Sequence, residues 1–563
     1  MDTHDFFQLI VFVGALCITT PLLGWYIARI YDDKNPLRLP GFHSLERVIY
    51  RLCRIDPDQP MHWKTYAGAV LVFSGFGVAM VFLVQLLQRH LPLNIQHFPG
   101  VEVILALSTA VSFMTNTNWQ AYAGETTMAY LTQMAALAVQ NFLSPATAIA
   151  VVAALARGFS RKSSRSIGNF WSDLTKAVIY ILLPLSFIFA LILVEQGTPQ
   201  TLKQYATATT LEGQEQIIPL GPAASQIAIK QLGTNGGGFF NANSAHPFEN
   251  PTPLSNFFEL FAIFLIPAAL TWAFGKMIGS TRQGWALFFA MMILFCAGLL
   301  VSLLGENGFN PVLNVNAPLE GKELRFGTTG SALFATVTTA ASCGAVNCMH
   351  ESLSPLSHLA TMFNMMVGEV IFGGVGSGLY GMVLYAIMAV FIAGLMVGRT
   401  PEYLGKKIDA FEVKMSVIGI LGSSVILLML AAIAISVKAG ISSLSTQGCA
   451  GLSEIIYAFA SVSNNNGSAF GGLNANTPFY NVMTAIAEIG GRFTTLLAVL
   501  AIAGSLAMKK IKPASEGTFP TDGLLFLCLL IGTVVIVGAL NFFPVLSIGP
   551  ILEHLLMMSG KGM

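Results

Sequence analysis

Residues 233–248 read GTNGGGFFNANSAHPF, and residues 464–479 read NNNGSAFGGLNANTPF. The polar loops in these stretches, Gly233 to Gly238 and Ser463 to Gly467, each follow an apolar run that is too short to cross a bilayer. Each also precedes a run that is long enough to cross. Two further polar loops, Thr115 to Trp119 and Ser342 to Ala345, occupy the same position although their residues differ. The chain therefore repeats the order span, short helix, polar loop, span four times.

The composition places these repeats in a membrane. The 563 residues are 54% hydrophobic and 10% charged, whereas soluble domains carry about 25% charged residues. Apolar runs of about 20 residues recur along the chain, among them Phe6–Ala28, Tyr66–Leu87, Ala177–Val194, Trp285–Leu304, Ser416–Val437 and Leu524–Phe543. The sequence predicts an all-α polytopic membrane protein with about ten transmembrane helices, the four polar loops being re-entrant.

We expect a single transmembrane domain over residues 1–563, because no segment is large enough to form a separate soluble domain. Its expected parts are a first span with a cytoplasmic loop (1–63), four repeats (64–160, 170–281, 284–398 and 414–508) and a last span (522–545). Similar but unequal repeats within one chain predict pseudo-fourfold symmetry without oligomerisation.

The charges predict the orientation of the chain. Most of the 29 Lys and Arg residues fall in alternate connections, beginning with residues 29–64 and 157–176. By the positive-inside rule these connections are cytoplasmic. An even number of crossings then puts both termini outside, and the four loops open toward the outer face. The Pro-rich, basic connection from Tyr31 to Lys64 is a candidate docking surface.

The four loops have the residue types of a cation filter. A polar loop at membrane depth is tolerated where it lines a water-filled or ion-filled path. Main-chain carbonyls replace the water around an ion where Gly or small polar residues turn them toward one axis. The candidate ligands are the carbonyls of Asn116, Thr117, Asn118, Thr234, Asn235, Gly236, Ser342, Cys343, Gly344, Asn465, Asn466 and Gly467.

None of these twelve residues is charged, which favours a weakly hydrated monovalent cation over Mg²⁺ or Ca²⁺, since those ions usually recruit carboxylates. One such loop alone is more typical of an ordinary Asn/Gly turn between helices, but four in equivalent places favour a filter. Ahead of each loop a short helix would aim the negative end of its dipole at the ion. We expect these helices over Val101–Met114, Ala223–Leu232, Ser331–Ala341 and Leu452–Val462.

The third inner span, from about Leu359 to Val397, is rich in glycine. Gly373, Gly374, Gly376 and Gly378 interrupt it, and each Gly costs a helix about 1 kcal/mol relative to Ala. We expect this stretch to unwind and to form a constriction or gate beneath the filter; close helix packing through small residues is the alternative. A GxGxxG match in the stretch neither follows a strand nor opens a βαβ unit, so it does not indicate a dinucleotide site.

Ionisable residues inside the spans are further candidates. Glu369 immediately precedes the glycine-rich stretch and could attract a cation below the filter. Glu488 and Arg492 lie four residues apart and are expected to form a structural ion pair. The chain has neither a GxxxxGK[ST] motif nor the Asp-Lys-Thr-Gly-Thr motif of P-type pumps. It is therefore expected to be non-catalytic, and any active transport requires a partner.

Six segments carry a resemblance to a known family. They are SFMTNTNWQAYAGE, GTNGGGFFNANSAHPFENP, TTAASCGAVNCMHESLSP, GEVIFGGVGSGLYGM, GRTPEYLGKKID and NNNGSAFGGLNANTPF. These segments resemble those of the potassium-transporting ATPase A chain, the potassium-binding subunit of the bacterial Kdp complex. The similarity covers nearly the whole chain.

The resemblance implies a fold akin to potassium channels, with potassium as the transported ion and no organic cofactor. The twelve filter residues named above match the family's filter, and Gln120 matches a position that shapes selectivity. The broken span near Glu369 would block straight passage, so that the ion turns sideways through a tunnel into an ATPase subunit.

The resemblance also implies a location and partners. The chain would lie in the bacterial inner membrane, surrounded by lipid and without a nucleic-acid partner. Its partners would be a P-type ATPase catalytic subunit (B), a single-span C subunit and a small F peptide. The alternative function is a stand-alone potassium channel or ion-coupled potassium transporter of the same architecture.

Overall fold

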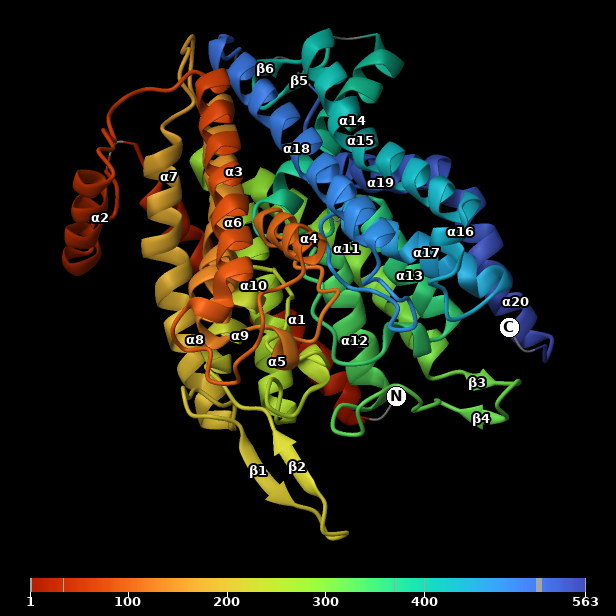
Figure 1. The fold of residues 1–563 in the computed structure, drawn as a ribbon. Coiled ribbons are helices and arrows are strands. Elements are labelled where there is room, and N and C mark those ends of the chain that lie inside the picture. The colour runs from red at the N-terminus through yellow and green to blue at the C-terminus, as the bar shows by residue number, and fades with distance from the viewer. Residues whose placement is uncertain (1–2, 34, 369, 399, 513–518, 562–563) are drawn as a thin grey trace.

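The computed structural model describes residues 3–33, 35–368, 370–398, 400–512 and 519–561. Long helices running in roughly the same direction dominate it (Figure 1). Over the described residues, ten helices are long and apolar enough to cross a membrane. The predicted all-α architecture with ten spans is therefore confirmed.

Four pairs of these spans enclose the middle of the molecule. The first member of each pair is α3 (Trp63–Leu87), α7–η3–α8 (Phe170–Lys176, Ala177–Leu182, Leu183–Gln196), α11 (Thr281–Glu306) or α15 (Ala410–Ser436). The second member is η2–α6 (Thr132–Ala138, Val139–Ser160), α10 (Pro253–Met277), α14 (Ser377–Val397) or α18 (Pro478–Met508). In the most apolar stretch of each second member, 61% to 89% of the residues are buried, against 28% to 56% in the first members. The second members are thus the inner spans.

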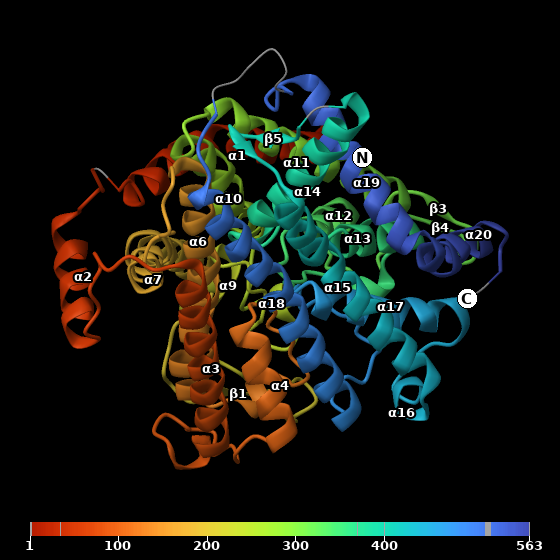
Figure 2. The same cartoon turned by 90° about the horizontal axis from the view of Figure 1, so that it is seen from above.

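A short helix and a polar loop connect the two members of each pair. The short helices are α4 (Val103–Met114), α9 (Ala223–Leu232), α12 (Gly327–Ala340) and α17 (Gly448–Ser463). Seen from above, they surround the middle of the bundle (Figure 2). α9 has the expected bounds, and the other three differ from the expected ones by two to four residues at the N-terminal end and by at most one at the C-terminal end, as helix boundaries often do.

The remaining spans flank this array. α1 (Thr3–Ile30) packs along α10, and α19 (Leu524–Leu546) packs against α11 and α14. α19 continues through η6 (Ser547–Ile551) into α20 (Leu552–Met558), so this helical segment is longer than the predicted Leu524–Phe543. Only 17% and 28% of the most apolar residues in these two spans are buried. Both therefore present most of their apolar surface to the bilayer.

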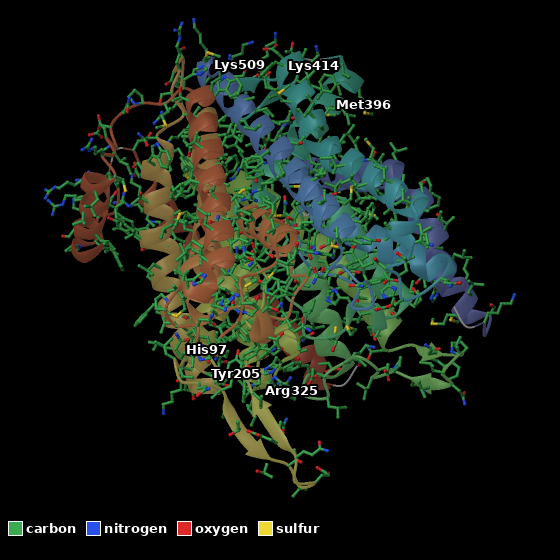
Figure 3. The ribbon with its side chains drawn as sticks, in the orientation of Figure 1. His97, Tyr205, Arg325, Met396, Lys414 and Lys509 are labelled. Atoms are coloured by element: carbon green, nitrogen blue, oxygen red, sulfur yellow. The ribbon has the colours of Figure 1, made fainter. Side chains whose placement is uncertain are left out.

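The two ends of the bundle differ: most of the Lys and Arg residues fall in the connections between spans at one end, here called the basic end. Lys414 and Lys509 lie at one end, whereas His97, Tyr205 and Arg325 lie at the other (Figure 3). The second end carries two hairpins, β1–β2 (Ala206–Thr209, Glu215–Ile218) and β3–β4 (Phe309–Asn310, Val315–Asn316). Smaller elements at this end are η1 (Gln88–His90), α5 (Gly124–Thr127), η4 (Asn243–Ala245), η5 (His350–Ser352) and α16 (Lys438–Ile441).

A third hairpin, β5–β6 (Glu402–Tyr403, Lys406–Lys407), joins helix ends at the basic end. The Lys406 ammonium group donates to the carbonyls of Arg161 at 2.6 Å, Leu506 at 2.9 Å and Lys509 at 2.7 Å. This side chain therefore ties together the ends of α6 and α18. Arg399, which precedes the hairpin, lies outside the described residues.

Candidate ion-binding site formed by four loops

Each of the four polar loops directly follows the C-terminal end of a short helix. α4 ends at Met114, α9 at Leu232, α12 at Ala340 and α17 at Ser463. The last carbonyls of a helix carry the negative end of its dipole. All four short helices therefore direct negative potential toward the region in which the loops lie.

The four loops share one backbone conformation. Two positions, separated by one residue, have positive φ in every loop. At the first position φ is +70° in Asn116, +49° in Thr234, +52° in Ser342 and +61° in Asn465. At the second position φ is +53° in Asn118, +80° in Gly236, +84° in Gly344 and +106° in Gly467. Non-glycine residues rarely adopt positive φ, so its recurrence at matching positions is a structural repeat that the residue identities do not display.

The residue between these two positions makes the same hydrogen bond in all four loops. Its main-chain N–H group donates to the carbonyl five residues earlier, in the preceding short helix. The pairs are Thr117 to Ser112 at 3.0 Å, Asn235 to Lys230 at 2.8 Å, Cys343 to Thr338 at 3.0 Å and Asn466 to Ser461 at 2.8 Å. Alternating backbone handedness turns successive N–H groups to one side of a chain. With the N–H groups directed back at the helices, carbonyls are available on the opposite side.

The loops adjoin one another in a closed ring. A methyl group added at Gly236 would overlap the Cys343 carbonyl, one at Gly344 would overlap the Asn466 carbonyl, and one at Gly467 would overlap the Thr117 carbonyl. The ring closes between the first two loops, where a methyl group on Gly237 would lie 2.8 Å from the Asn118 Cβ. Main chain thus packs on main chain at three of the four junctions and on the Asn118 side chain at the fourth, and this close approach requires residues without a side chain.

Side chains hold neighbouring loops together. Asn116 donates from Nδ2 to the Thr234 carbonyl at 2.9 Å, and the Ser342 hydroxyl donates to the Asn465 carbonyl at 2.9 Å. Asn465 in turn donates from Nδ2 to the Thr117 hydroxyl oxygen at 3.0 Å. These Asn, Ser and Thr residues are therefore bracing groups as well as candidate ligands.

An open cavity of about 760 Å³ lies against the outer side of the ring, and Asn118, Gly236, Gly344 and Gly467 from all four loops line it. Gln120 also lines this cavity. Its side chain accepts from the Gly238 N–H at 2.9 Å and donates to the Gly238 carbonyl at 3.0 Å. Gln120 therefore couples the first loop to the second beside this cavity.

Behind the second loop lies a buried charged cluster that sequence reasoning missed. Lys230 of α9 is fully buried; its ammonium group forms an ion pair with Glu249 and donates to Asn243 Oδ1 at 2.7 Å. Asn243 donates from Nδ2 to the Gly236 carbonyl at 2.6 Å. Lys230 thus acts through Asn243 on a loop carbonyl. An ionisable residue in an apolar short helix was the available signal, since such residues pair with a partner at membrane depth.

Beneath the ring, the third inner span is interrupted as the glycines predicted. α13 (Pro355–Met366) ends before the stretch that contains Gly373, Gly374 and Gly376, and Gly378 lies in the first turn of α14. Gly376 has φ +90°, and a methyl group there would lie 2.6 Å from the Ala148 carbonyl. Glu369, the other residue assigned to this gate, lies outside the described residues.

Hydrogen bonds connect the broken stretch directly to the ring. The Val375 N–H donates to the Thr234 hydroxyl oxygen at 3.0 Å, and the Gly373 N–H donates to the Ala340 carbonyl at 3.2 Å. The Phe372 ring packs against Phe264, with 4.8 Å between centroids. The interruption is therefore an ordered element placed just below the second and third loops.

The expected ion pair between Glu488 and Arg492 is wrong for the described structure. Arg492 donates from Nη2 to the Ser144 carbonyl at 3.2 Å and lines a cavity of about 50 Å³ beside Ser342 and Asn465. Both carboxyl oxygens of Glu488 are buried without a hydrogen-bond partner. Spacing of four residues permits contact on a helix, but here the guanidinium group is directed into the cavity below the ring.

Comparisons with known proteins show the family of the chain. The sequence matches the family described as Potassium-transporting ATPase A subunit over residues 10–555. It is 52% identical to a potassium-transporting ATPase potassium-binding subunit of Mesorhizobium japonicum, with 100% of each chain covered. It is 53% identical to a protein of the same name from Pseudomonas aeruginosa, with 99% of each chain covered.

A solved structure resembles the fold. The crystal structure of the potassium transporter TrkH from Vibrio parahaemolyticus superposes with a TM-score of 0.52 and 14% sequence identity. The match covers 88% of this chain and 97% of that chain. At this identity the likeness concerns the fold alone.

Proposed function

Because the chain belongs to the family of potassium-transporting ATPase A subunits, we propose that it selects potassium at the ring of four loops and passes it to a P-type ATPase subunit. The chain itself is a non-catalytic, potassium-binding membrane subunit. The proposal concerns which of its atoms hold the ion and where the ion goes next.

The proposed ligands are main-chain carbonyls of residues 116–118, 234–236, 342–344 and 465–467. A carbonyl ring replaces the hydration shell of an ion, and the four helix ends add negative potential without a formal charge. The loops lack carboxylates, so a strongly hydrated divalent ion gains too little to lose its water. The arrangement therefore suits a monovalent cation such as potassium.

One observation carries this proposal: the same pair of positive-φ positions in all four loops, which meet in a closed ring. Four unrelated turns between helices have no reason to share these angles and to pack main chain against main chain. A common ligand at the centre of the ring supplies that reason.

The proposed route begins in the outer cavity and crosses the ring. Below it the ion meets the broken stretch between α13 and α14, which is hydrogen-bonded to the second loop. A straight path is then closed, and the ion leaves sideways toward an ATPase subunit. In this route Gly373, Gly374, Gly376 and Gly378 allow the main chain to form the barrier, and Gln120 shapes selectivity at the entrance.

The proposed surroundings follow from the same assignment. The subunit lies in the bacterial inner membrane with the Lys-rich end in the cytoplasm and both termini outside. Its partners are the ATPase subunit, a single-span C subunit and a small F peptide. A stand-alone potassium channel or ion-coupled transporter of this fold would need none of them.

A growth experiment tests the proposal. A cell lacking potassium uptake is given either this chain alone or this chain together with its partner subunits, at micromolar potassium. We expect growth only with the partners, and no growth when the phosphorylated aspartate of the ATPase subunit is replaced by asparagine. Growth supported by the chain alone would show that it is a self-sufficient transporter.

A further inference from the structure

Helix α2 (Pro40–Leu52) lies outside the bundle. Both views place it at the edge of the molecule, beside α7 and away from the other spans (Figures 1 and 2). It belongs to the basic connection between the first two spans, which the proposed ion route does not use. Its three faces differ in chemistry, and each face has a different neighbour.

The face directed at the bundle carries polar residues beside apolar ones, since Phe42 and Ile49 pack against the core. Glu46 is buried and accepts hydrogen bonds from the Tyr50 hydroxyl at 2.7 Å and the Tyr180 hydroxyl at 2.8 Å. His43 Nδ1 lies 3.1 Å from Glu46 Oε2. The Tyr50 hydroxyl also lies 3.0 Å from the Ser172 hydroxyl. These bonds fix α2 against α7 and η3, and therefore fix which residues point outward.

A second face is apolar and exposed. Leu45, Val48 and Leu52 are 42%, 50% and 76% exposed. At about 100° per residue, these three positions fall within one arc of the helix of about 60°. A helix that faces water usually turns polar residues outward, whereas α2 turns leucine and valine outward. Lipid as the outer neighbour accounts for this exposed apolar face.

The third face is basic. Arg47 and Arg51 share an arc of the helix and are exposed, with Arg54 just after the helix end. Arg47, Arg38 and Lys176 line a cavity of about 620 Å³ between α2 and the bundle. Two of the acidic residues that line this cavity, Asp173 and Asp33, pair with Arg157, and Asp58 also lines it. No ion pair within the described residues involves Arg38, Arg47 or Arg51, so they are free to meet an external anion.

The depth of α2 matches a membrane interface. Trp63, Trp171 and Trp285 lie at the starts of α3, α7 and α11, and Trp25 lies near the end of α1. Tryptophans gather at the membrane–water boundary, so these helix ends mark that boundary. Tyr50 contacts Ser172, the residue after Trp171, and the rest of α2 runs from there along α7 and η3. Arg51 and Arg54, at this end of α2, therefore lie at headgroup level, and Arg47 lies one turn further along the helix.

We propose that α2 binds anionic phospholipid headgroups through the basic face near its C-terminal end. Leu45, Val48 and Leu52 face the acyl region, while Arg47 and Arg51 contact the headgroup phosphates. Basic residues at a membrane surface attract anionic lipid, and long arginine side chains reach the interface from a buried stem. The proposed lipid site does not depend on the proposed ion route. It uses the proposed orientation of the chain only to place the site in the cytoplasmic leaflet.

Fluorescence quenching in nanodiscs that contain the whole complex tests this proposal. A bimane probe is placed on Val48→Cys, in a chain whose exposed Cys53, Cys296 and Cys528 are changed to serine. Brominated phosphatidylglycerol and brominated phosphatidylcholine serve as quenchers at equal mole fraction. A probe on Val72→Cys of α3, which is 70% exposed and has no basic face beside it, is the matched control.

We expect phosphatidylglycerol to quench the Val48 probe more strongly than phosphatidylcholine, with no such preference at Val72. Each arginine near an anionic surface supplies about a fivefold local preference. Arg47→Gln with Arg51→Gln should remove most of the preference while quenching by phosphatidylcholine persists, and the two Arg→Lys changes should retain it.

Three results would overturn the proposal. Equal quenching by both lipids at Val48 removes the headgroup preference. A preference that survives the two Arg→Gln changes assigns it to other residues. Quenching at Val72 but not at Val48 in the complex means that a partner subunit, rather than lipid, covers α2.

Discussion

An alanine at position 236 would place a methyl group against the main chain of the neighbouring loop. Gly236 has φ +80°, and the added Cβ would overlap the Cys343 carbonyl oxygen. The left-handed backbone costs a non-glycine residue about 1–2 kcal/mol. Overpacking against a tightly held neighbour adds about 1–3 kcal/mol. The overlap would displace the Cys343 carbonyl, which is a proposed ligand of the ion.

The hairpin β1–β2 offers a matched control. Gly213 has φ +81°, but a Cβ added there meets no atom within 4 Å. Gly213→Ala therefore carries the same backbone strain without the overlap and without a contact to the ring. The difference between the two variants isolates the overlap with the Cys343 carbonyl.

The assay is potassium-stimulated ATPase activity of the purified complex as a function of potassium concentration. If the overlap cost is expressed in ion binding, 1–3 kcal/mol raises the half-maximal potassium concentration by about 5-fold to 150-fold in Gly236→Ala. Rubidium should then be rejected less strongly. Gly213→Ala should match the unsubstituted protein. Equal potassium dependence in all three proteins would refute the reasoning that the Cys343 carbonyl belongs to the ion site.

Three further changes test other parts of the site. Gln120→Arg removes two hydrogen bonds to Gly238, worth about 1 kcal/mol each, and adds a positive charge at the entrance; uptake assays should show potassium affinity weakened about tenfold or more, and an unchanged affinity contradicts the role of Gln120. Lys230→Met leaves Glu249 buried and unpaired, which costs about 3–5 kcal/mol of stability. Thermal unfolding of the complex should show a large decrease in Tm, and adding Glu249→Gln should partly restore the Tm. Equal decreases in the single and double variants would argue against a charge effect. Burial lowers the pKa of His246 below its ordinary value of 6.5, so the unfolded chain takes up this proton at a higher pH than the folded chain. The stability should therefore be greatest above about pH 6.5 and should fall as the pH is lowered toward the folded pKa. His246→Asn should flatten this part of the profile of Tm against pH, and a profile that the substitution leaves unchanged would count against the assignment.

The spans and the loops could be predicted from sequence for a physical reason. Ten runs had to be long and apolar to cross a bilayer, and a polar loop between apolar runs needs a path to line. Gly376 and its neighbours predicted the interruption of the third inner span because helix formation penalises glycine locally. These signals are encoded in a few consecutive residues.

Other features depended on contacts that the sequence does not reveal. Lys230 and Glu249 lie 19 residues apart, and neither shows by itself that it pairs with the other. Arg492 turned away from Glu488 because a cavity and the Ser144 carbonyl were available below the ring. α2 was missed as a helix because it has apolar residues on its outer face as well as its inner one, whereas amphipathic patterns are usually read with one apolar face inside.

The most direct measurement is a density map of the complex prepared with rubidium or thallium in place of potassium. These heavier monovalent ions scatter strongly enough to be located. Our interpretation predicts an ion peak on the axis of the ring, surrounded by carbonyls of residues 116–118, 234–236, 342–344 and 465–467. An ion held elsewhere, for instance beside Glu488, with the ring empty at saturating concentration, would contradict it.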